Sequence, residues 1–554
     1  MHSRAYAVAV GFVTALTLLV TTACSGGTGG NNTPNNDVPG GSNVYGDDTS
    51  ITIRGCTPQN TLIPTNTNEV CGGNVLDATE AKLVHYNSDN AAPELDIAKS
   101  IDTTDAINWT VTLKQGYKFQ DGTEVKSKNF VDAWNWGADC KNGQVNSYFF
   151  APIVGFTDPT GDGCSTTSTM SGLKVVDDYT FTIQTTAPTS NLEVRLGYTA
   201  FAPQPDAFFA DTTADKSEFS KLPIAAGPYQ IVTNDDTQMV LKRFADYSGT
   251  YKGSVGQVTF KIYQDTSAAY NDVVANNLDV TDVIPADDLV GDLWKSDLVT
   301  SAGQPRWGTK NTGIIQVMTF APTTVDPQMT LQMRQAISMG YDRSAITSTI
   351  FNNARVPATG WVSPVVDGYK ADQCTNCVYD PVKAKQLYDE AGGYKGTLQL
   401  SVNADGGHDP WANAVCNQLK TNLGVNCVVN DVPNFATLRT QIQKRELKGM
   451  YRGGWQMDYP SIENFLAPIY ATGASSNDSD YSNPQFDSLL TQAAAATDSA
   501  TANSLYQQAE ALLNTDMPTM PLWYQQSQYG FSTKIKSINM TPFSTFDLSS
   551  VVFA

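Results

Sequence analysis

Histidine is scarce in this sequence, and the motifs of several common catalytic sites are missing. The 554 residues include three histidines, His2, His85 and His408. No H-E-x-x-H, G-x-S-x-G or G-x-x-x-x-G-K-[ST] pattern occurs, so zinc peptidases, α/β-hydrolases and P-loop nucleotidases lack their defining residues. Carboxylates are plentiful, but no pair of them stands out as an acid and a base. We therefore expect no enzyme, no cofactor and no bound metal, with a hydrolase as a remote alternative.

Positive charge and long apolar runs are also in short supply. The chain has 35 Lys and Arg against 55 Asp and Glu, a formal net charge of −20. A surface of this sign repels the phosphates of nucleic acids, so we expect no nucleic-acid partner. After the first 24 residues no apolar run reaches the roughly 18 residues that a membrane-spanning helix needs. The remainder is too long for one hydrophobic core and predicts two or three domains.

The first 24 residues have the pattern of an export signal. Arg4 precedes an apolar stretch from Ala5 to Val20, and small residues then lead to Cys24. This order is typical of a cleaved signal peptide. The cleavage site resembles that of bacterial lipoproteins, although Thr21 stands where Leu is usual. We expect residues 1–23 to be removed and Cys24 to carry a lipid that anchors the protein to the outer face of the cell membrane, with ordinary secretion as the alternative.

Residues 24–50 are predicted to form a flexible tether. From Ser25 to Ser50 nearly all residues are Gly, Asn, Thr, Ser, Pro or Asp, and the only sizeable apolar residues are Val38, Val44 and Tyr45. Such a segment cannot bury enough surface to fold. As a random coil it would span ~25 Å.

The eight other cysteines support an oxidising location. They fall into four close pairs along the chain, which suggests four local disulfides. The pairs are Cys56 with Cys71, Cys140 with Cys164, Cys374 with Cys377, and Cys416 with Cys427. The sequence does not fix this connectivity, because eight cysteines allow about 105 arrangements. The pair Cys374 and Cys377 also matches a C-x-x-C redox or half-zinc pattern, but no second C-x-x-C accompanies it, so we favour a structural bridge.

Apolar periodicity predicts a small α+β segment followed by alternating strands and helices. The α+β segment contains a half-buried strand over Asn108–Lys114, a helix from Ser127, and a hairpin over Leu173–Ile183. From residue 222 onward, the predicted elements are a hairpin over Gln230–Phe244, a strand over Val258–Tyr263, and helices over Ser267–Asn277, Leu331–Ile346 and Asp380–Ala391. Alternation of this kind predicts α/β layers.

Six motifs occur in an order that resembles a known family. They are W-T-V-T-L-K-x-G-x-K-F-x-D-G-T from Trp109, G-P-Y from Gly227, L-K-R-F-A-D-Y from Leu241, R-Q-A-I-x-x-x-x-D-R from Arg334, Y-D-P-x-K-A-K-x-L from Tyr379, and G-W-x-x-D-Y-P from Gly454. Together they resemble the oligopeptide/dipeptide-binding class (family 5) of solute-binding proteins of ABC importers, from about residue 51 to the C-terminus.

The resemblance implies a two-lobed α/β fold of the periplasmic-binding-protein type (type II, cluster C), with an extra α+β subdomain in the first lobe. The implied segments are 51–85, 199–315 and 521–554 for lobe I, 86–198 for the extra subdomain, and 316–520 for lobe II. Hinges are expected near Thr312–Phe320 and Pro518–Trp523. Closure of the lobes around a ligand would then present the importer with a distinct surface.

The resemblance also implies a binding site. The acidic residue after G-W-x-x, Asp458, would hold the α-ammonium of a peptide, with Trp455 as an apolar wall and Tyr459 beside it. The backbone of Gly453 and Gly454 could pair with an extended peptide. On lobe I the candidates are Thr57 and Asn60. For the peptide carboxylate they are Arg355 and Arg452.

The implied function is the capture of extracellular oligopeptides and their delivery to an ABC permease and its ATPase. We expect a monomer that contacts the membrane through its lipid anchor. A protein of the same fold that binds a non-peptide solute, such as an oligosaccharide or a metal complex, is the main alternative.

Overall fold

A large mixed sheet organises the chain. The computed structural model describes residues 44–157, 169–433, 435–474 and 476–554. The sheet has eleven strands, ten of them in the order β15-β14-β16-β12-β17-β11-β1-β10-β9-β8, while β13 pairs with β17 off this path. The bounds are β1 (Ser50–Gly55), β8 (Tyr229–Asn234), β9 (Gln238–Arg243), β10 (Gln257–Ile262), β11 (Val280–Thr281), β12 (Trp307–Phe320), β13 (Arg355–Pro357), β14 (Thr397–Asn403), β15 (Asn426–Val432), β16 (Met450–Gln456) and β17 (Thr519–Phe531).

Smaller sheets complete the β-structure. A four-stranded sheet has the order β4-β5-β7-β6, and two further sheets pair β2 with β3 and β18 with β19. Their bounds are β2 (Val84–Tyr86), β3 (Pro93–Leu95), β4 (Ala98–Thr103), β5 (Asn108–Leu113), β6 (Leu173–Asp177), β7 (Thr180–Gln184), β18 (Ile535–Met540) and β19 (Phe546–Phe553).

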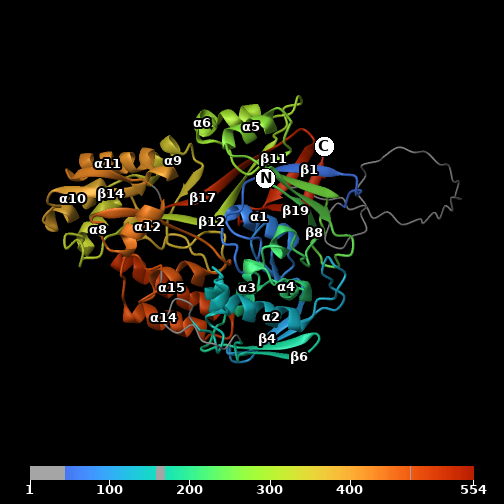
Figure 1. The fold of residues 1–554 in the computed structure, drawn as a ribbon. Coiled ribbons are helices and arrows are strands. Elements are labelled where there is room, and N and C mark those ends of the chain that lie inside the picture. Colours follow the sequence, from blue (N-terminus) through green and yellow to red (C-terminus); the bar gives the residue numbers. More distant parts are fainter. Residues whose placement is uncertain (1–43, 158–168, 434, 475) are drawn as a thin grey trace, which may run out of the picture. The chain divides into compact units, whose positions relative to one another are not determined.

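Helices accompany the strands throughout the described chain (Figure 1). They are α1 (Val70–Thr79), α2 (Ser127–Ala138), α3 (Leu192–Arg195), α4 (Asp206–Ala210), α5 (Thr266–Val274), α6 (Ala286–Leu289), α7 (Leu293–Asp297), α8 (Leu331–Met339), α9 (Arg343–Ile350), α10 (Pro381–Glu390), α11 (Asp409–Leu423), α12 (Phe435–Gln443), α13 (Ala467–Tyr470), α14 (Pro484–Ala494) and α15 (Ser499–Asp516). Short 3₁₀ turns include η9 (Ile462–Phe465). No helix in the described ranges combines the length and the apolar character that a membrane crossing requires.

Local sequence signals explain several of these elements. In β5, Trp109, Val111 and Leu113 are buried and the residues between them are not, as the alternation predicts. The Asp380 side chain accepts a hydrogen bond from the backbone N of Lys383, so it caps α10, which begins with a proline. Gly392, with φ of 84°, follows the end of this helix in a conformation that favours glycine. The predicted strands, hairpins and helices in these regions are confirmed, with one exception among the helices.

That exception is the helix predicted over Leu331–Ile346, which is two helices. The first, α8, ends at Met339 with Gly340 as its C-cap. The Asp342 side chain then accepts a hydrogen bond from the backbone N of Ala345 at 3.0 Å and starts α9. A capping aspartate inside an apolar pattern therefore interrupts the helix.

The predicted tether also ends earlier than residue 50. Tyr45 is only 4 % exposed and its ring packs edge-on against Phe553, with ring centroids 4.7 Å apart. Its backbone N donates to the carbonyl of Ser254 at 2.7 Å, and Arg243 forms an ion pair with Asp47. The ring of Tyr45 thus packs against a residue near the C-terminus. Because of these contacts, residues 44–50 belong to the folded part. Residues 24–43, including Cys24, lie outside the described residues.

Three clusters of buried apolar side chains form the main cores. Apart from Ala91, the largest draws its members from residues 315–524, and the second draws most of its members from residues 81–201. The third combines residues 45–78 with 229–280 and 531–551. β17 contributes residues to the first and third clusters, so it connects two cores.

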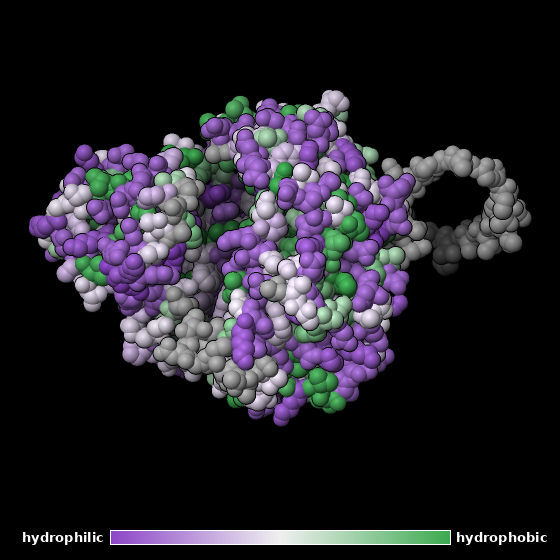
Figure 2. Space-filling view, viewed as in Figure 1, coloured by the Kyte–Doolittle hydropathy of each residue, from purple (hydrophilic) through white to green (hydrophobic). Residues whose placement is uncertain are grey.

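β12 and β17 lie side by side as antiparallel neighbours (Figure 1). Their register breaks between Asn311 and Ile315 and again between Gln316 and Val317. The expected hinge segments lie in and directly before these two strands. The surface turned toward the viewer in Figure 2 is largely hydrophilic, as expected for an acidic chain.

Disulfides join Cys56 with Cys71, Cys374 with Cys377, and Cys416 with Cys427, which are three of the expected pairs. Cys140 is also disulfide-bonded, but its expected partner, Cys164, lies outside the described residues.

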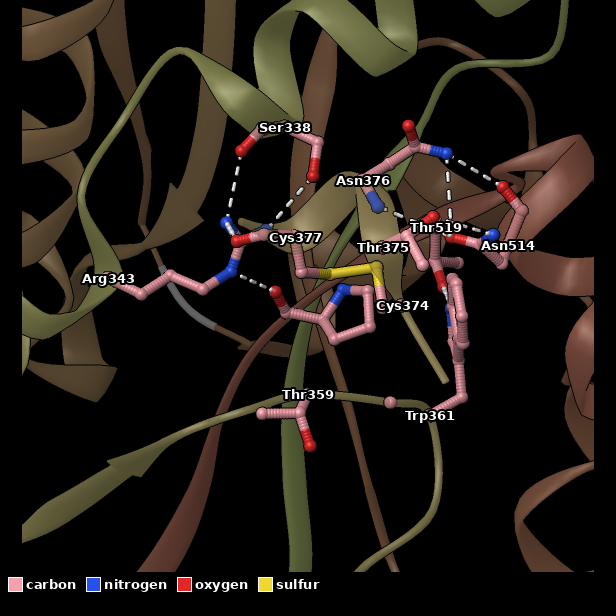
Figure 3. Close-up of a disulfide and its surroundings, with 12 residues drawn as sticks. Ser338, Arg343, Thr359, Trp361, Cys374, Thr375, Asn376, Cys377, Asn514 and Thr519 are labelled. Atoms are coloured by element: carbon pink, nitrogen blue, oxygen red, sulfur yellow. Dashed lines mark hydrogen bonds between the residues drawn. A yellow bond between two sulfur atoms is a disulfide. The ribbon is translucent and has the colours of Figure 1, made fainter. Parts of the chain in front are cut away.

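The C-x-x-C bridge is buried and forms part of a packed core. Cys374 is 3 % exposed and Cys377 is 7 % exposed. Figure 3 shows Arg343 beside this bridge, where its guanidinium donates to the carbonyls of Cys377, Ser338 and Pro521. Pro521 lies in β17, so the arginine ties the bridge to that strand. No group of three or more His, Cys, Asp or Glu suited to a metal ion occurs among the described residues.

Candidate functional site

Asp458 follows β16 and lies at a cavity of about 260 Å³. The side chain is half-buried, and its Oδ2 accepts a hydrogen bond from Nδ2 of Asn464 at 3.1 Å. Burial raises the pKa of Asp458 to about 6, opposed by the Asn464 hydrogen bond and the charge of Arg195 and reinforced by the charge of Glu463. The hydrogen-bond partner of this carboxylate within the described residues is thus a neutral amide. When ionised, the carboxylate keeps its negative charge available for a cation.

Residues far apart in the sequence line the rest of this cavity. Lys82 pairs with Asp77 at 3.2 Å, and Glu69 caps α1 by accepting from the backbone N of Cys71 and Gly72. These charges therefore already have partners. The lining comes from Thr67–Val70, Gly73, Asn74, Leu76, Asp77, Lys82, His85, Tyr86, Gly197–Thr199, Gln456–Asp458, Thr541, Phe543 and Thr545.

Besides Tyr459, three tyrosines lie close enough to Asp458 for its charge to affect their pKa. Burial is the main cause, and the Asp458 charge a further cause, of the raised pKa of Tyr86, Tyr148 and Tyr198. Tyr86 and Tyr198 also line the cavity. An acidic group among aromatic rings is suited to an ammonium ion, which gains from the carboxylate and from the ring faces. Sequence reasoning missed these tyrosines, because no local pattern connects them with Asp458.

A second cavity of about 270 Å³ lies against β16. Arg452, Gly453, Gly454 and Trp455 line it, together with residues of β12 and α12. Along one edge, β16 pairs with β12 from Met450 to Gln456. Along the other edge, β14 pairs only with Met450 and Tyr451 within the described residues. The Gly453 carbonyl accepts a hydrogen bond from Nε2 of Gln316, in β12, at 2.9 Å.

The glycines in β16 allow a close approach to β12. A Cβ at Gly454 would lie 2.9 Å from the carbonyl oxygen of Ile315, and one at Gly453 would lie 2.9 Å from Oγ1 of Thr319. A larger residue at Gly454 would push β16 away from the backbone of β12, whereas one at Gly453 would first meet the side chains of Thr319 and Val317. The packing of the sheet thus favours glycine at position 454 independently of any ligand.

Tyr459 lies outside both cavities. Its side chain is 3 % exposed, and its hydroxyl donates to Oε2 of Glu463 at 2.7 Å. Glu463 also pairs with Arg195 at 3.1 Å and accepts from Asn191 at 2.7 Å. Tyr459 thus belongs to a buried polar network that joins η9 to α3.

The remaining predicted residues lie apart from Asp458. Thr57 is exposed, and Asn60 is half-buried and reaches the cavity lining only through its side-chain contact with Asn68 at 3.4 Å. The Arg355 guanidinium donates to the carbonyls of Ala354 and Gln526 and lines neither cavity. Of the two candidate arginines, Arg452 lines the second of these cavities and Arg355 lines neither.

Comparisons with known proteins agree on one family. The model of the bacterial extracellular solute-binding proteins, family 5 (middle), matches residues 92–477. Oligopeptide-binding protein OppA of Bacillus subtilis is 23 % identical over 541 residues, which cover 94 % of this chain and 95 % of the relative. Periplasmic oligopeptide-binding protein OppA of Escherichia coli is 26 % identical over 500 residues, covering 88 % of this chain and 89 % of the relative.

Solved structures show the same fold. The unliganded open form of the periplasmic murein tripeptide-binding protein MppA superposes with a TM-score of 0.78 at 23 % identity, over 93 % of this chain and 99 % of that protein. OppA of Haemophilus influenzae in complex with the peptide RPPGFSPFR superposes with a TM-score of 0.70 at 20 % identity, over 91 % of this chain and 99 % of that protein. The two-lobed α/β fold is thereby confirmed. The chain belongs to family 5 of the bacterial extracellular solute-binding proteins.

Proposed function

We propose that the protein is the substrate-binding component of an ABC importer and that it captures extracellular oligopeptides by their free amino terminus. One observation carries the proposal: Asp458 presents a half-buried carboxylate, bonded to a neutral amide, at a cavity that also contains aromatic rings. The names of the relatives, which include oligopeptide-, dipeptide- and glutathione-binding proteins, support a ligand of this class.

The charge of Asp458 favours an ammonium ligand. Unit charges ~4 Å apart gain about 4 kcal/mol at an effective dielectric of 20. Closure of the lobes would remove water from the carboxylate, and leaving it unpaired there would be costly. A peptide with a free amino terminus satisfies this charge, whereas an acetylated one cannot.

The part of β16 that follows its pairing with β14 would bind the peptide backbone. An extended ligand beside Gly453 and Gly454 would gain main-chain hydrogen bonds that do not depend on its sequence. Trp455 would form an apolar wall along this path, and Arg452, which lines the second cavity, is the candidate for the peptide carboxylate. Gly453 and Gly454 keep the strand free of side chains there. The roles of Tyr459, Thr57 and Asn60 in binding stay predictions.

Two further parts of the proposal concern architecture. The segments 51–85, 199–315 and 521–554 would form lobe I, 86–198 the extra subdomain, and 316–520 lobe II. The separate apolar clusters and the register breaks in β12 and β17 support a hinge at these strands. Closure around the peptide would then create the surface that the permease and its ATPase recognise.

The location follows from the N-terminal sequence. Residues 1–23 would be removed, and a lipid on Cys24 would anchor a monomer to the outer face of the cell membrane. Mass spectrometry of the membrane fraction tests this, because lipidation adds the mass of the acyl chains to Cys24. A protein recovered with an unmodified Cys24 would refute the anchor.

The binding proposal is tested by calorimetric titration of the purified protein, stripped of carried-over ligand by unfolding and refolding. We expect mixed di- to hexapeptides to bind and the same peptides, N-acetylated, to fail. Asp458→Ala should weaken binding by at least tenfold, or ~1.4 kcal/mol. The matched control is Asp389→Ala, which removes an exposed aspartate of α10. If acetylated peptides bind equally well, the amino-terminal anchor is wrong. If neither set binds, the ligand is a non-peptide solute.

A further inference from the structure

The side chain of Asn464 connects the two residues on which the proposed site depends. Asn464 is 2 % exposed and belongs to η9. Its Oδ1 accepts from the indole Nε1 of Trp455 at 3.0 Å and from the backbone N of Asp458 at 2.9 Å. Its Nδ2 donates to Oδ2 of Asp458 at 3.1 Å. One buried amide therefore holds the anchoring carboxylate, the backbone behind it and the aromatic wall.

Only one orientation of this amide satisfies its neighbours. Two N–H groups point at Oδ1, and a carboxylate oxygen faces Nδ2. A rotation that exchanged the two ends would place the NH₂ group against two donors. Because the amide is also buried, water cannot replace the lost bonds. The direction of the Asp458 carboxylate is therefore set by Asn464.

The turn that carries Asn464 is itself held in place. Ser461 caps it by accepting from the backbone N of Glu463 at 3.3 Å. The neighbouring Glu463 carboxylate is bound by Arg195, Asn191 and Tyr459. Because so many contacts hold this turn, the Asn464 amide has little freedom to move. The Asp458 carboxylate therefore takes the position that the amide allows.

We propose that Asn464 is a positioning residue that fixes both the direction and the ionisation of the Asp458 carboxylate, and that the preference for a free amino terminus depends on it. The inference rests on the proposed function. Asn464 does not touch the ligand and acts through Asp458 and Trp455. The hydrogen bond from its amide stabilises the ionised carboxylate of Asp458, which burial destabilises.

Other charged and titratable groups act on Asp458 as well and must stay constant in a test. They are Arg195 of α3, Glu463 of η9, and the hydroxyls of Tyr86, Tyr148, Tyr198 and Tyr459. Substitutions at Asn464 change none of these residues. A change in the titration of Asp458 is then attributable to position 464: in Asn464→Leu to the lost amide, and in Asn464→Asp to the lost amide together with repulsion by the added carboxylate.

Two variants separate the roles of the amide. Asn464→Asp keeps the oxygen acceptor for Trp455 and the backbone but replaces the donor with a second carboxylate oxygen. Asn464→Leu removes all three hydrogen bonds and keeps the number and branching of the side-chain heavy atoms. The matched control is Asn503→Leu, which removes a comparable amide-to-carboxylate bond, from Asn503 to Asp367 at 2.7 Å, elsewhere in the chain.

The first measurement is the pKa of Asp458 in the ligand-free protein, from the pH dependence of its carboxyl ¹³C resonance, assigned by its loss in Asp458→Asn. We expect both Asn464 variants to raise this pKa by at least about one, because a hydrogen bond to the charged form is lost. The second is titration with tri-alanine across the same pH range. A rise of one would cost about fivefold in affinity near pH 6, because a smaller fraction of Asp458 is ionised.

The outcomes distinguish the inference from the proposed function. Asn464 variants that lose thermal stability but leave the pKa of Asp458 and the pH profile of tri-alanine binding unchanged would overturn the inference. The same shifts in Asn503→Leu would overturn it as well, because they would show a nonspecific effect. A further outcome is that the pKa of Asp458 rises as expected while tri-alanine and N-acetyl-tri-alanine bind alike. In that case Asn464 sets the ionisation of Asp458, but the proposed capture of peptides by their free amino terminus fails.

Discussion

The buried carboxyl of Glu510 should make the stability of this protein depend on pH in an unusual direction. Glu510 lies in α15 and is 1 % exposed. Its Oε1 accepts from the backbone N of Trp361 at 2.9 Å. Burial raises the pKa of Glu510 from 4.5 to about 7, against the hydrogen bonds from the backbone of Trp361 and Val362 and the charge of Lys370.

The direction in which Glu510 makes stability depend on pH follows from proton linkage. Because the folded state binds the Glu510 proton more tightly than the unfolded state does, this group favours folding below about pH 4.5. Its contribution is lost as the pH rises toward the folded pKa of about 7. The interval between the two pKa values corresponds to about 3 kcal/mol, at roughly 1.4 kcal/mol per pH unit. Glu510→Gln keeps a neutral, hydrogen-bonding side chain at every pH and should remove this dependence.

Urea denaturation of the wild type and of Glu510→Gln tests the reasoning. At about pH 4 the free energies of unfolding should be similar, because Glu510 is then largely protonated in both the folded and the unfolded state. At about pH 8 the variant should be more stable, by up to about 3 kcal/mol. Glu390→Gln, which changes an exposed glutamate at the end of α10, should show no such difference. A Glu510→Gln variant without a gain at the higher pH would show that Glu510 is not desolvated.

Three further predictions concern the site and the covalent frame. Affinity for tri-alanine should fall about tenfold per pH unit well below pH 6, because protonation of Asp458 removes the charge that its burial already destabilises. Calorimetry should find this dependence absent in Asp458→Asn. A flat wild-type profile would contradict the role of Asp458 as the ammonium anchor. Arg195→Met should lower the free energy of unfolding by about 3–5 kcal/mol, because it leaves Glu463 buried without its cation. In a double-mutant cycle measured by urea denaturation, Arg195→Met combined with Glu463→Gln should cost less than the sum of the two single changes. Strict additivity would mean that the pair does not interact. Replacing Cys56 and Cys71 with Ser should cost ~3 kcal/mol for a loop of 15 residues, and a thiol assay of the untreated protein should find no free thiol; a free thiol would break the pairing scheme.

Features with a local cause were predictable from the sequence. The capping aspartate and first-turn proline of α10 lie within a few residues of the helix that they start. The alternation in β5 and the turns of the hairpins are equally local. The cysteine pairs were predictable because the two members of each pair are close along the chain. Each of these signals lies within the element that it specifies.

Contacts between distant segments were not predictable. The packing of Tyr45 against Phe553 joins the two ends of the described chain, and the Arg195–Glu463 pair joins residues 268 positions apart. The sequence around Asp458 carries the family motif, but nothing in it indicates that tyrosines from three other segments lie near this carboxylate. Asn464 belongs to the same short stretch, yet an isolated asparagine after a turn has no signature that reveals its buried hydrogen bonds.

The disulfides have a consequence for the order of events outside the cell. Each of the three described bridges joins a cysteine to the next cysteine along the chain. If the proposed export carries the chain across the membrane from its N-terminus, every bridge can close as soon as its second cysteine emerges, before any later cysteine is available. Oxidation in order of emergence then produces the native pairs directly. Maturation of these bridges should need an oxidant but little isomerase, because a wrong pair can form only when an earlier thiol has been left open.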